Sequence, residues 1–247
     1  MLNSKALTRH TYIDGVIASN PCDKVKIPKA GKVKREIRPL VQSEINSFLS
    51  VIKDNPYETI FKVALFTGFR LGEITGLQWH NIDFETGTIT VDHQLKRRKD
   101  ATYYFDETKT HMIRKIKPAP SVIKLLAQHK KTQAAQRLAA GNLWNESSFS
   151  DLVFTNELGK FYGANTLLHN VQRLAAKIGV EGFTFHDLRH TFAVTSILAG
   201  DDIYTISKTL GHSSIKVTLD TYSHYTDDLR NKASMNMETL LQGLSGL

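Results

Sequence analysis

The sequence predicts a mainly helical protein with a small antiparallel β-sheet at one edge, an α+β fold. Apolar residues recur at helical spacing along most of the chain, and strict alternation of apolar and polar residues is concentrated in residues 88–95. The 247 residues, 41% of them hydrophobic, are enough for one good-sized core and a small appendage. We expect the appendage at residues 1–37 and the main domain at residues 38–247.

The order of the elements follows from the same spacing. Helices are predicted over residues 1–20, 45–52, 57–68, from 71 onward, 121–140, 167–178, 186–198, 203–211, 215–222 and 227–241. Strands are predicted over residues 88–95, 103–105 and 112–116. Gly68 and Gly72 are expected to let the backbone bend tightly, so Arg70 should lie between two helices.

The charge of the chain favours a polyanionic partner. The formal net charge is +8 and the isoelectric point is near 9.4. Seven basic residues and one acid lie between Lys24 and Arg38, which is either a solvated linker or a strap that lies on phosphates. The single cysteine, Cys22, excludes an internal disulfide and fits a reducing cytoplasm. No apolar stretch approaches the length of a membrane span.

Four motifs carry residues that suit phosphate chemistry. In chain order they are Thr67-Gly68-Phe69-Arg70-Leu71-Gly72-Glu73, Glu107-Thr108-Lys109-Thr110, His186-Asp187-Leu188-Arg189-His190, and Leu210-Gly211-His212 with Tyr222 ten residues behind. Arginines hold phosphate oxygens in a planar fork, histidines move protons, and a tyrosine can attack phosphorus. Together the motifs resemble the tyrosine recombinases, the family of phage and transposon integrases, from Arg38 to the C-terminus.

The resemblance implies the catalytic-domain fold of DNA breaking and rejoining enzymes, and a site-specific recombinase that works through a 3′-phosphotyrosine. The catalytic residues it implies are Arg70, Lys109, His186, Arg189, His212 and Tyr222. In the implied roles the arginines bind the scissile phosphate, Lys109 protonates the leaving 5′ oxygen, and His186 helps to deprotonate Tyr222. His212 hydrogen-bonds the phosphate. Neither a metal nor a cofactor is needed.

The resemblance also implies the partners. These are double-stranded DNA and further protomers of the same chain, as a tetramer on DNA, in the cytoplasm with the nucleoid. The residues expected to bind DNA are Lys24, Lys26, Lys29, Lys32, Lys34, Arg35, Arg38, Lys96, Arg97 and Arg98. Residues 1–37 could supply only the last helix of a core-binding domain, so the chain is expected to be a fragment. The apolar tail from Asp227 is expected to dock in cis or on the next protomer.

Each assignment has a plainer alternative when its residue is taken alone. Arg70 could simply pair with Glu73, and His212 could cap a helix. Lys109 competes with its basic neighbours, Arg114 among them, and Tyr222 competes with Tyr204 and Tyr225. Only their joint occurrence in this order favours catalysis.

Two other functions also remain open at this stage. Residues 203–222 could form a helix-turn-helix, as in a DNA-binding protein without chemistry. His186 and His190, at i and i+4, could bind zinc with His212, although Arg189 beside them opposes a metal.

Overall fold

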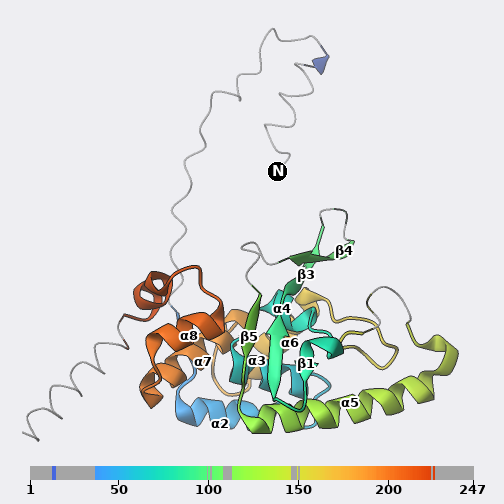
Figure 1. Ribbon diagram of the computed structural model, residues 1–247, viewed down its shortest axis with the longest axis horizontal. Coiled ribbons are helices and arrows are strands. Elements are labelled where there is room, and N and C mark those ends of the chain that lie inside the picture. The colour runs from blue at the N-terminus through green and yellow to red at the C-terminus, as the bar shows by residue number, and fades with distance from the viewer. Residues whose placement is uncertain are drawn as a thin grey trace, which may run out of the picture. The chain divides into compact units, whose positions relative to one another are not determined.

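The computed structural model describes residues 13–14, 37–98, 100, 102–107, 113–145, 149, 151–223 and 225. The chain divides into two compact units, Met1–Glu36 and Ile37–Leu247. The helix expected over residues 1–20 lies outside the described part except for residues 13 and 14. The basic run of residues 24–35 and the helix expected over residues 227–241 lie wholly outside it. Figure 1 shows the elements of the second unit.

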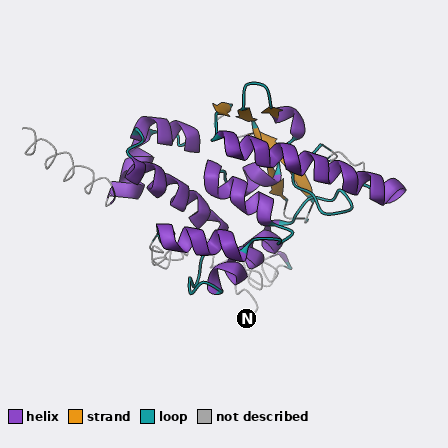
Figure 2. Ribbon diagram, turned by 90° about the horizontal axis from the view of Figure 1, so that it is seen from below, coloured by secondary structure: helices purple, strands orange, loops and turns teal. Residues whose placement is uncertain are grey.

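Helices make up most of the second unit, as Figure 2 shows. They are α2 (Gln42–Val51), α3 (Glu58–Thr67), α4 (Leu71–Thr75), α5 (Pro120–Ala140), α6 (Ala164–Ala176), α7 (Phe185–Ala199) and α8 (Ile203–Leu210), with short 3₁₀ turns at Trp79–Asn81 and Gly141–Leu143. A further helical stretch covers residues 215–223. The mainly helical prediction is confirmed, and the described helices that had both ends predicted have bounds within a few residues of those expected.

In the described part of the chain, the strands form two small antiparallel sheets rather than one. They are β1 (Ile82–Asp83), β2 (Thr88–Val91), β3 (His93–Arg97), β4 (Tyr103–Glu107) and β5 (Arg114–Ile116). One sheet has the order β1-β2-β5 and the other pairs β3 with β4. The prediction of a single strand over residues 88–95 is wrong. The stretch is divided between β2 and β3, because the chain leaves the first sheet at Asp92 and enters the second.

Gly72 was expected to allow a tight bend, but the structure gives it a different role. It lies inside α4 rather than at a bend, and a Cβ atom there would come within 3.1 Å of the Leu95 carbonyl oxygen. The missing side chain therefore lets β3 pack directly on α4. Gly68 does end α3 in the left-handed conformation, with φ of 66°, so Arg70 lies at the junction of two helices as predicted.

Two apolar clusters hold the unit together. The larger one is built around α2, α3, α6 and the three-stranded sheet, with Phe48, Phe61 and Phe183 fully buried. The smaller one joins α7, α8 and Tyr222. Figure 1 shows α7 and α8 together at one end of the unit, and α5 running along one side to the opposite end.

Among the described residues, no helix is long and apolar enough to cross a membrane.

Candidate active site at the ends of four helices

Arg70 lies where α3 ends and α4 begins. Its backbone N–H donates to Glu73 Oε2 at 2.8 Å, which satisfies the first turn of α4. Its guanidinium donates to Glu73 Oε1 at 2.8 Å and to the Gly211 carbonyl at 3.0 Å. The side chain is 38% exposed, so part of the guanidinium faces solvent. Arg70 therefore pairs with Glu73, as the plain alternative says, and still presents charge at the surface.

Arg189 is the buried arginine of the pair. A capping box holds the start of α7, since Asp187 Oδ2 accepts from the backbone N–H and the hydroxyl of Thr184 at 2.6 and 2.7 Å. Arg189, one turn further, is 2% exposed and donates to the carbonyls of Gly68 at 2.8 Å and Leu210 at 2.7 Å. These contacts bring the ends of α3 and α8 to α7.

Burial, with the nearby charge of Arg70, lowers the pKa of the Arg189 guanidinium to about 9. That value is above neutral pH, so Arg189 carries its charge. Arg70 and Arg189 thus place two positive charges at one site.

His212 follows the left-handed Gly211 that ends α8. Its Nδ1 lies 2.7 Å from the buried hydroxyl of Thr218. Burial, followed by the charges of Arg189 and Arg70, lowers its pKa to about 4, so the ring is neutral at neutral pH. If the Thr218 hydroxyl donates to Nδ1, the ring proton sits on Nε2, where it can be donated to an oxygen.

Tyr222 lies in the smaller apolar cluster and is 1% exposed. Its hydroxyl is 2.9 Å from Nδ1 of His190, and the two rings meet edge to face. Burial raises the pKa of Tyr222 to about 12, and the charge of Arg189 opposes this rise. If this hydroxyl attacks phosphorus, as expected from the resemblance, it needs both a proton acceptor and a route to the surface.

His190 is the residue that sequence reasoning did not place in the site. The structure puts His190, rather than His186, on the Tyr222 hydroxyl. The His186 ring meets the His190 ring edge-on with centroids 4.6 Å apart, and burial, followed by the Arg189 charge, lowers the pKa of His186. The i, i+4 spacing of the two histidines on one helix was the available signal, because it puts both on one face of α7.

The helix over residues 215–223 is packed less deeply than its sequence suggested. Thr218 and Tyr222 are buried, but Ile215 is 41% exposed and Leu219 is 38% exposed. Residues 215, 218, 219 and 222 fall on one helical face by their spacing, and two of the four are exposed rather than buried. Tyr225, a rival nucleophile, packs against the same small cluster.

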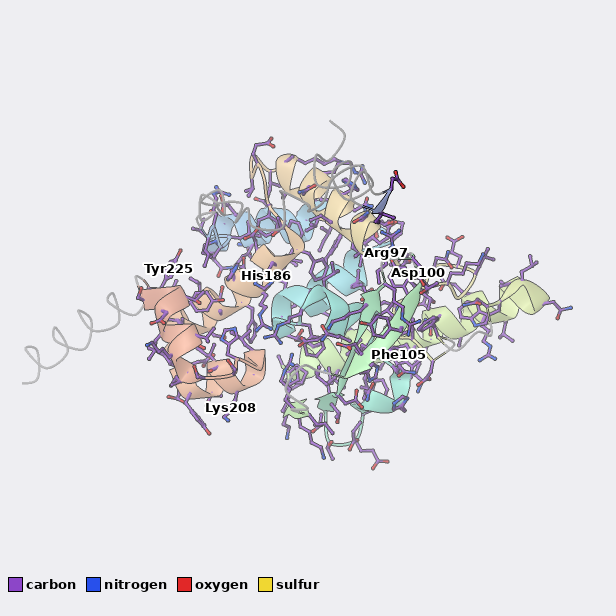
Figure 3. The ribbon with its side chains drawn as sticks, turned by 90° about the horizontal axis from the view of Figure 1, so that it is seen from above. Arg97, Asp100, Phe105, His186, Lys208 and Tyr225 are labelled. Carbon is purple, nitrogen blue, oxygen red and sulfur yellow. The ribbon has the colours of Figure 1, made fainter. Side chains whose placement is uncertain are left out.

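The remaining predicted residues are either outside the described part of the chain or paired or exposed elsewhere. Lys109 and the six basic residues from Lys24 to Arg35 lie outside the described part of the chain. Arg38 donates to Glu44 at 2.8 Å, and Lys96 pairs with Asp106. Arg97 and Arg98 are exposed at the end of β3. Figure 3 labels Arg97 on this sheet and His186 on α7.

The described residues contain no group of three histidine, cysteine, aspartate or glutamate side chains that could hold a metal ion. The zinc-hydrolase alternative thus finds no ligand set in that part of the chain. The helix-turn-helix alternative keeps its geometry, because α8 and residues 215–223 are joined by a turn at Gly211.

The fold and site define the class of tyrosine recombinase catalytic domains. The structure of the Tn1549 transposon integrase in complex with transposon right end DNA matches with a TM-score of 0.71 and 28% identity, over 96% of this chain and 76% of that one. The XerA recombinase matches in fold, with a TM-score of 0.61 and 22% identity, over 82% of this chain and 66% of that one. The chain belongs to the phage integrase family, whose model matches residues 38–228.

Two relatives extend the likeness. The tyrosine recombinase XerC-like protein of Caldanaerobacter subterraneus subsp. tengcongensis is 30% identical over 96% of this chain and 63% of its own length. The ICEBs1 integrase of Bacillus subtilis is 28% identical over 92% of this chain and 60% of its own. The chain thus spans about three-fifths of the length of these curated relatives.

Proposed function

We propose that this chain cleaves and rejoins DNA strands through a covalent 3′-phosphotyrosine, as the catalytic part of a site-specific recombinase of a mobile element. One observation carries the proposal. The hydrogen bonds of Arg70 and Arg189 join the ends of α3 and α8 to α7, and the same helix α7 carries the histidine that contacts the Tyr222 hydroxyl.

The reaction follows from these groups. The Tyr222 oxygen attacks phosphorus, a P–O bond to tyrosine forms, and the bond to the 5′ oxygen breaks. His190 accepts the phenolic proton, and the leaving 5′ oxygen takes up a proton, which we assign to Lys109 by the family resemblance. A phosphodiester is exchanged for a phosphodiester, so rejoining by the reverse step needs no other source of energy.

Fixed positive charge lowers the barrier. Negative charge builds on the equatorial oxygens in the transition state, and each preorganised donor is typically worth about 3 kcal/mol. Arg70 offers its exposed edge to one such oxygen, and His212 offers Nε2–H to another. Arg189 adds its charge from beneath. Because Tyr222 is 1% exposed, the helix over residues 215–223 must shift when DNA binds.

The partners we propose are duplex DNA and further copies of the chain. The solved Tn1549 integrase is in complex with transposon DNA, and the relatives include the ICEBs1 integrase and the transposase from transposon Tn916. A net charge of +8 suits DNA, and we place the protein on the nucleoid in the cytoplasm. A tetramer on two duplexes would exchange one pair of strands at a time.

The test is a trap for the covalent intermediate. The chain is incubated with a library of nicked duplexes of randomised sequence, so that the short strand released by cleavage diffuses away. A protease-sensitive adduct should form without added metal and should map to Tyr222. Binding without any adduct would favour the helix-turn-helix alternative, and an adduct that requires zinc would contradict the proposal.

A further inference from the structure

Glu73 is a buried acid that two arginines share. Its side chain is 2% exposed, and burial works against its charge. The hydrogen bonds and charge of Arg114, with the charge of Arg70, outweigh burial and lower the pKa of Glu73 to about 2. The carboxylate is therefore ionised at neutral pH.

Arg114 holds Glu73 more completely than Arg70 does. From β5 it donates Nη1 to Oε1 at 2.9 Å and Nη2 to Oε2 at 2.7 Å, a bidentate fork. Arg70 contributes one guanidinium bond, to Oε1. The Arg114 side chain is itself 10% exposed, whereas that of Arg70 is 38% exposed.

Arg114 also reaches the end of α8. Its Nε donates to the Thr209 carbonyl at 2.9 Å, and its guanidinium lies 5.8 Å from the centre of the Phe69 ring. A Cβ atom on Gly211 would come within 2.8 Å of its Nη1. Arg70 is held by Glu73 and by the Gly211 carbonyl, which accepts from its guanidinium. The Arg114 side chain therefore lies against both residues that hold Arg70 in place.

The role of Arg114 follows from the balance of charge among Glu73, Arg70 and Arg114. Two guanidinium charges face one carboxylate. Because Arg114 lies deeper and takes both carboxylate oxygens, it is the cation that balances Glu73. The charge of Arg70 is then left uncompensated at the surface. Without Arg114, Glu73 would draw Arg70 inward and cancel its charge.

We propose that Arg114 is a positioning residue for phosphate binding, which neutralises Glu73 and thereby leaves the Arg70 charge to the scissile phosphate. This inference rests on the proposed function for its catalytic consequence. The plain alternative is a structural ion pair, since breaking a buried pair is costly to folding in any protein. The experiment must therefore separate charge at Arg70 from stability.

The first measurement is the rate of adduct formation at saturating DNA, with the folded fraction checked for each variant. Arg114→Leu should slow cleavage by at least about tenfold, because charged groups in direct contact are energetically coupled. Adding Glu73→Gln should restore much of the rate, because Arg70 regains its charge. Arg114→Lys should fall between. The matched control is Arg137→Leu, in the last turn of α5 at the far end of the unit in Figure 1.

A substrate with an uncharged scissile group separates an effect on charge from an effect on stability, because a purely structural defect would slow cleavage of both substrates equally. On a duplex with a methylphosphonate at the scissile position, the charge of Arg70 has less to stabilise. The ratio of the Arg114→Leu rate to wild type should then approach one, as should that of Arg70→Ala. An equal loss on the charged and the neutral substrate would overturn the inference.

Binding gives a measurement that does not depend on chemistry. The slope of log affinity against log salt should fall by about one for Arg114→Leu, as for Arg70→Ala. It should return in the double variant. If the wild-type chain forms no adduct, the proposed function fails. The salt slopes of the wild type, Arg114→Leu and the double variant still show whether Arg114 leaves the charge of Arg70 free to bind phosphate.

The inference can be tested even if Arg114→Leu does not fold. If Arg114→Leu does not fold, the double variant, which buries no unpaired charge, takes its place. A double variant that cleaves within about tenfold of wild type supports the inference, since the coupling is then between Arg114 and Glu73. A folded double variant as slow as Arg70→Ala overturns it, as does an unchanged salt slope in folded Arg114→Lys and Arg114→Leu.

Discussion

The half of the site proposed to bind phosphate and the half that carries the proposed nucleophile are built differently. Glu73, Arg70 and Arg114 are tied by paired charges and by main-chain acceptors on α8, all close to the large core. Tyr222 rests in a small cluster, on a helix that leaves Ile215 and Leu219 more than a third exposed. The first half is preorganised, which suits electrostatic catalysis. The second half has little packing to lose when it moves.

The largest effect should come from the nucleophile half. Tyr222→Phe removes the attacking oxygen and should abolish the covalent adduct, while duplex affinity changes little. Gel analysis after protease treatment measures the adduct. Tyr225→Phe is the matched control and should keep the adduct. An adduct that survives Tyr222→Phe would show that another residue attacks.

Arg70→Ala tests the preorganised half. It should slow cleavage by about 100- to 1,000-fold, the usual consequence of losing one fixed donor to the transition state. Binding should weaken far less, because the bound duplex lacks the extra charge of the transition state. Single-turnover rates and affinities measure the two effects. Equal losses in both would mean that Arg70 only binds DNA.

His190→Gln tests the proton acceptor and should slow cleavage by about 100-fold, the lower range for acid–base catalysis. The pKa of Tyr222 is raised to about 12, so below that pH the phenolate fraction grows tenfold with each unit. The rate of the variant should therefore rise more steeply with pH than that of wild type. His169→Gln, on the exposed face of α6, should leave both unchanged. A parallel profile would remove His190 from this role.

Acid should weaken the preorganised half. The pKa of Glu73 is lowered to about 2, below its unfolded value of 4.5, so its contribution is present above pH 4.5 and is lost as pH falls toward 2. The difference corresponds to about 3 kcal/mol in the free energy of unfolding. Denaturant titrations from pH 5 to 2 measure it. Glu73→Gln should flatten this part of the curve, and an unchanged curve would show that the carboxylate is not held as described.

The smallest effect sharpens the contrast in packing. Leu219→Ala, on the helix of the nucleophile, should cost less than about 0.5 kcal/mol of stability, as at most surface positions. Phe48→Ala, in the large core and fully buried, should cost about 3–5 kcal/mol. Thermal or denaturant unfolding compares the two. A large cost for Leu219→Ala would mean that the helix is firmly anchored.

The sequence predicted what local spacing and motif order encode. The repeat from Ile45 to Ile52 indicated α2, and the motifs led to Arg70, Arg189, His212 and Tyr222, which do lie near one another. Their catalytic roles, and that of Lys109, stay predictions. Two sheets were not predicted, because alternation continues unbroken through Asp92 while the pairing partners change.

Long-range contacts were beyond that reasoning. Arg114 looked like one of several cations near Lys109, and its partner Glu73 lies 41 residues earlier in the chain. His190 pairs with a tyrosine 32 residues away. Residue type and spacing do not show which distant side chains will meet, because that depends on how the helices and strands pack against one another. The exposed side of residues 215–223 was missed for the same reason, since an apolar face shows only that something could cover it.

The end of α8 has a consequence for mutational scanning. The carbonyls of Thr209, Leu210 and Gly211 accept from three different arginines, Arg114, Arg189 and Arg70. A carbonyl is present whatever the side chain, so Thr209→Ala leaves its hydrogen bond in place and would score as harmless. Position 209 would then look unimportant in an alanine scan although its main chain contacts the site. Only changes that displace the backbone, such as a proline in the last turn of α8, would reveal it.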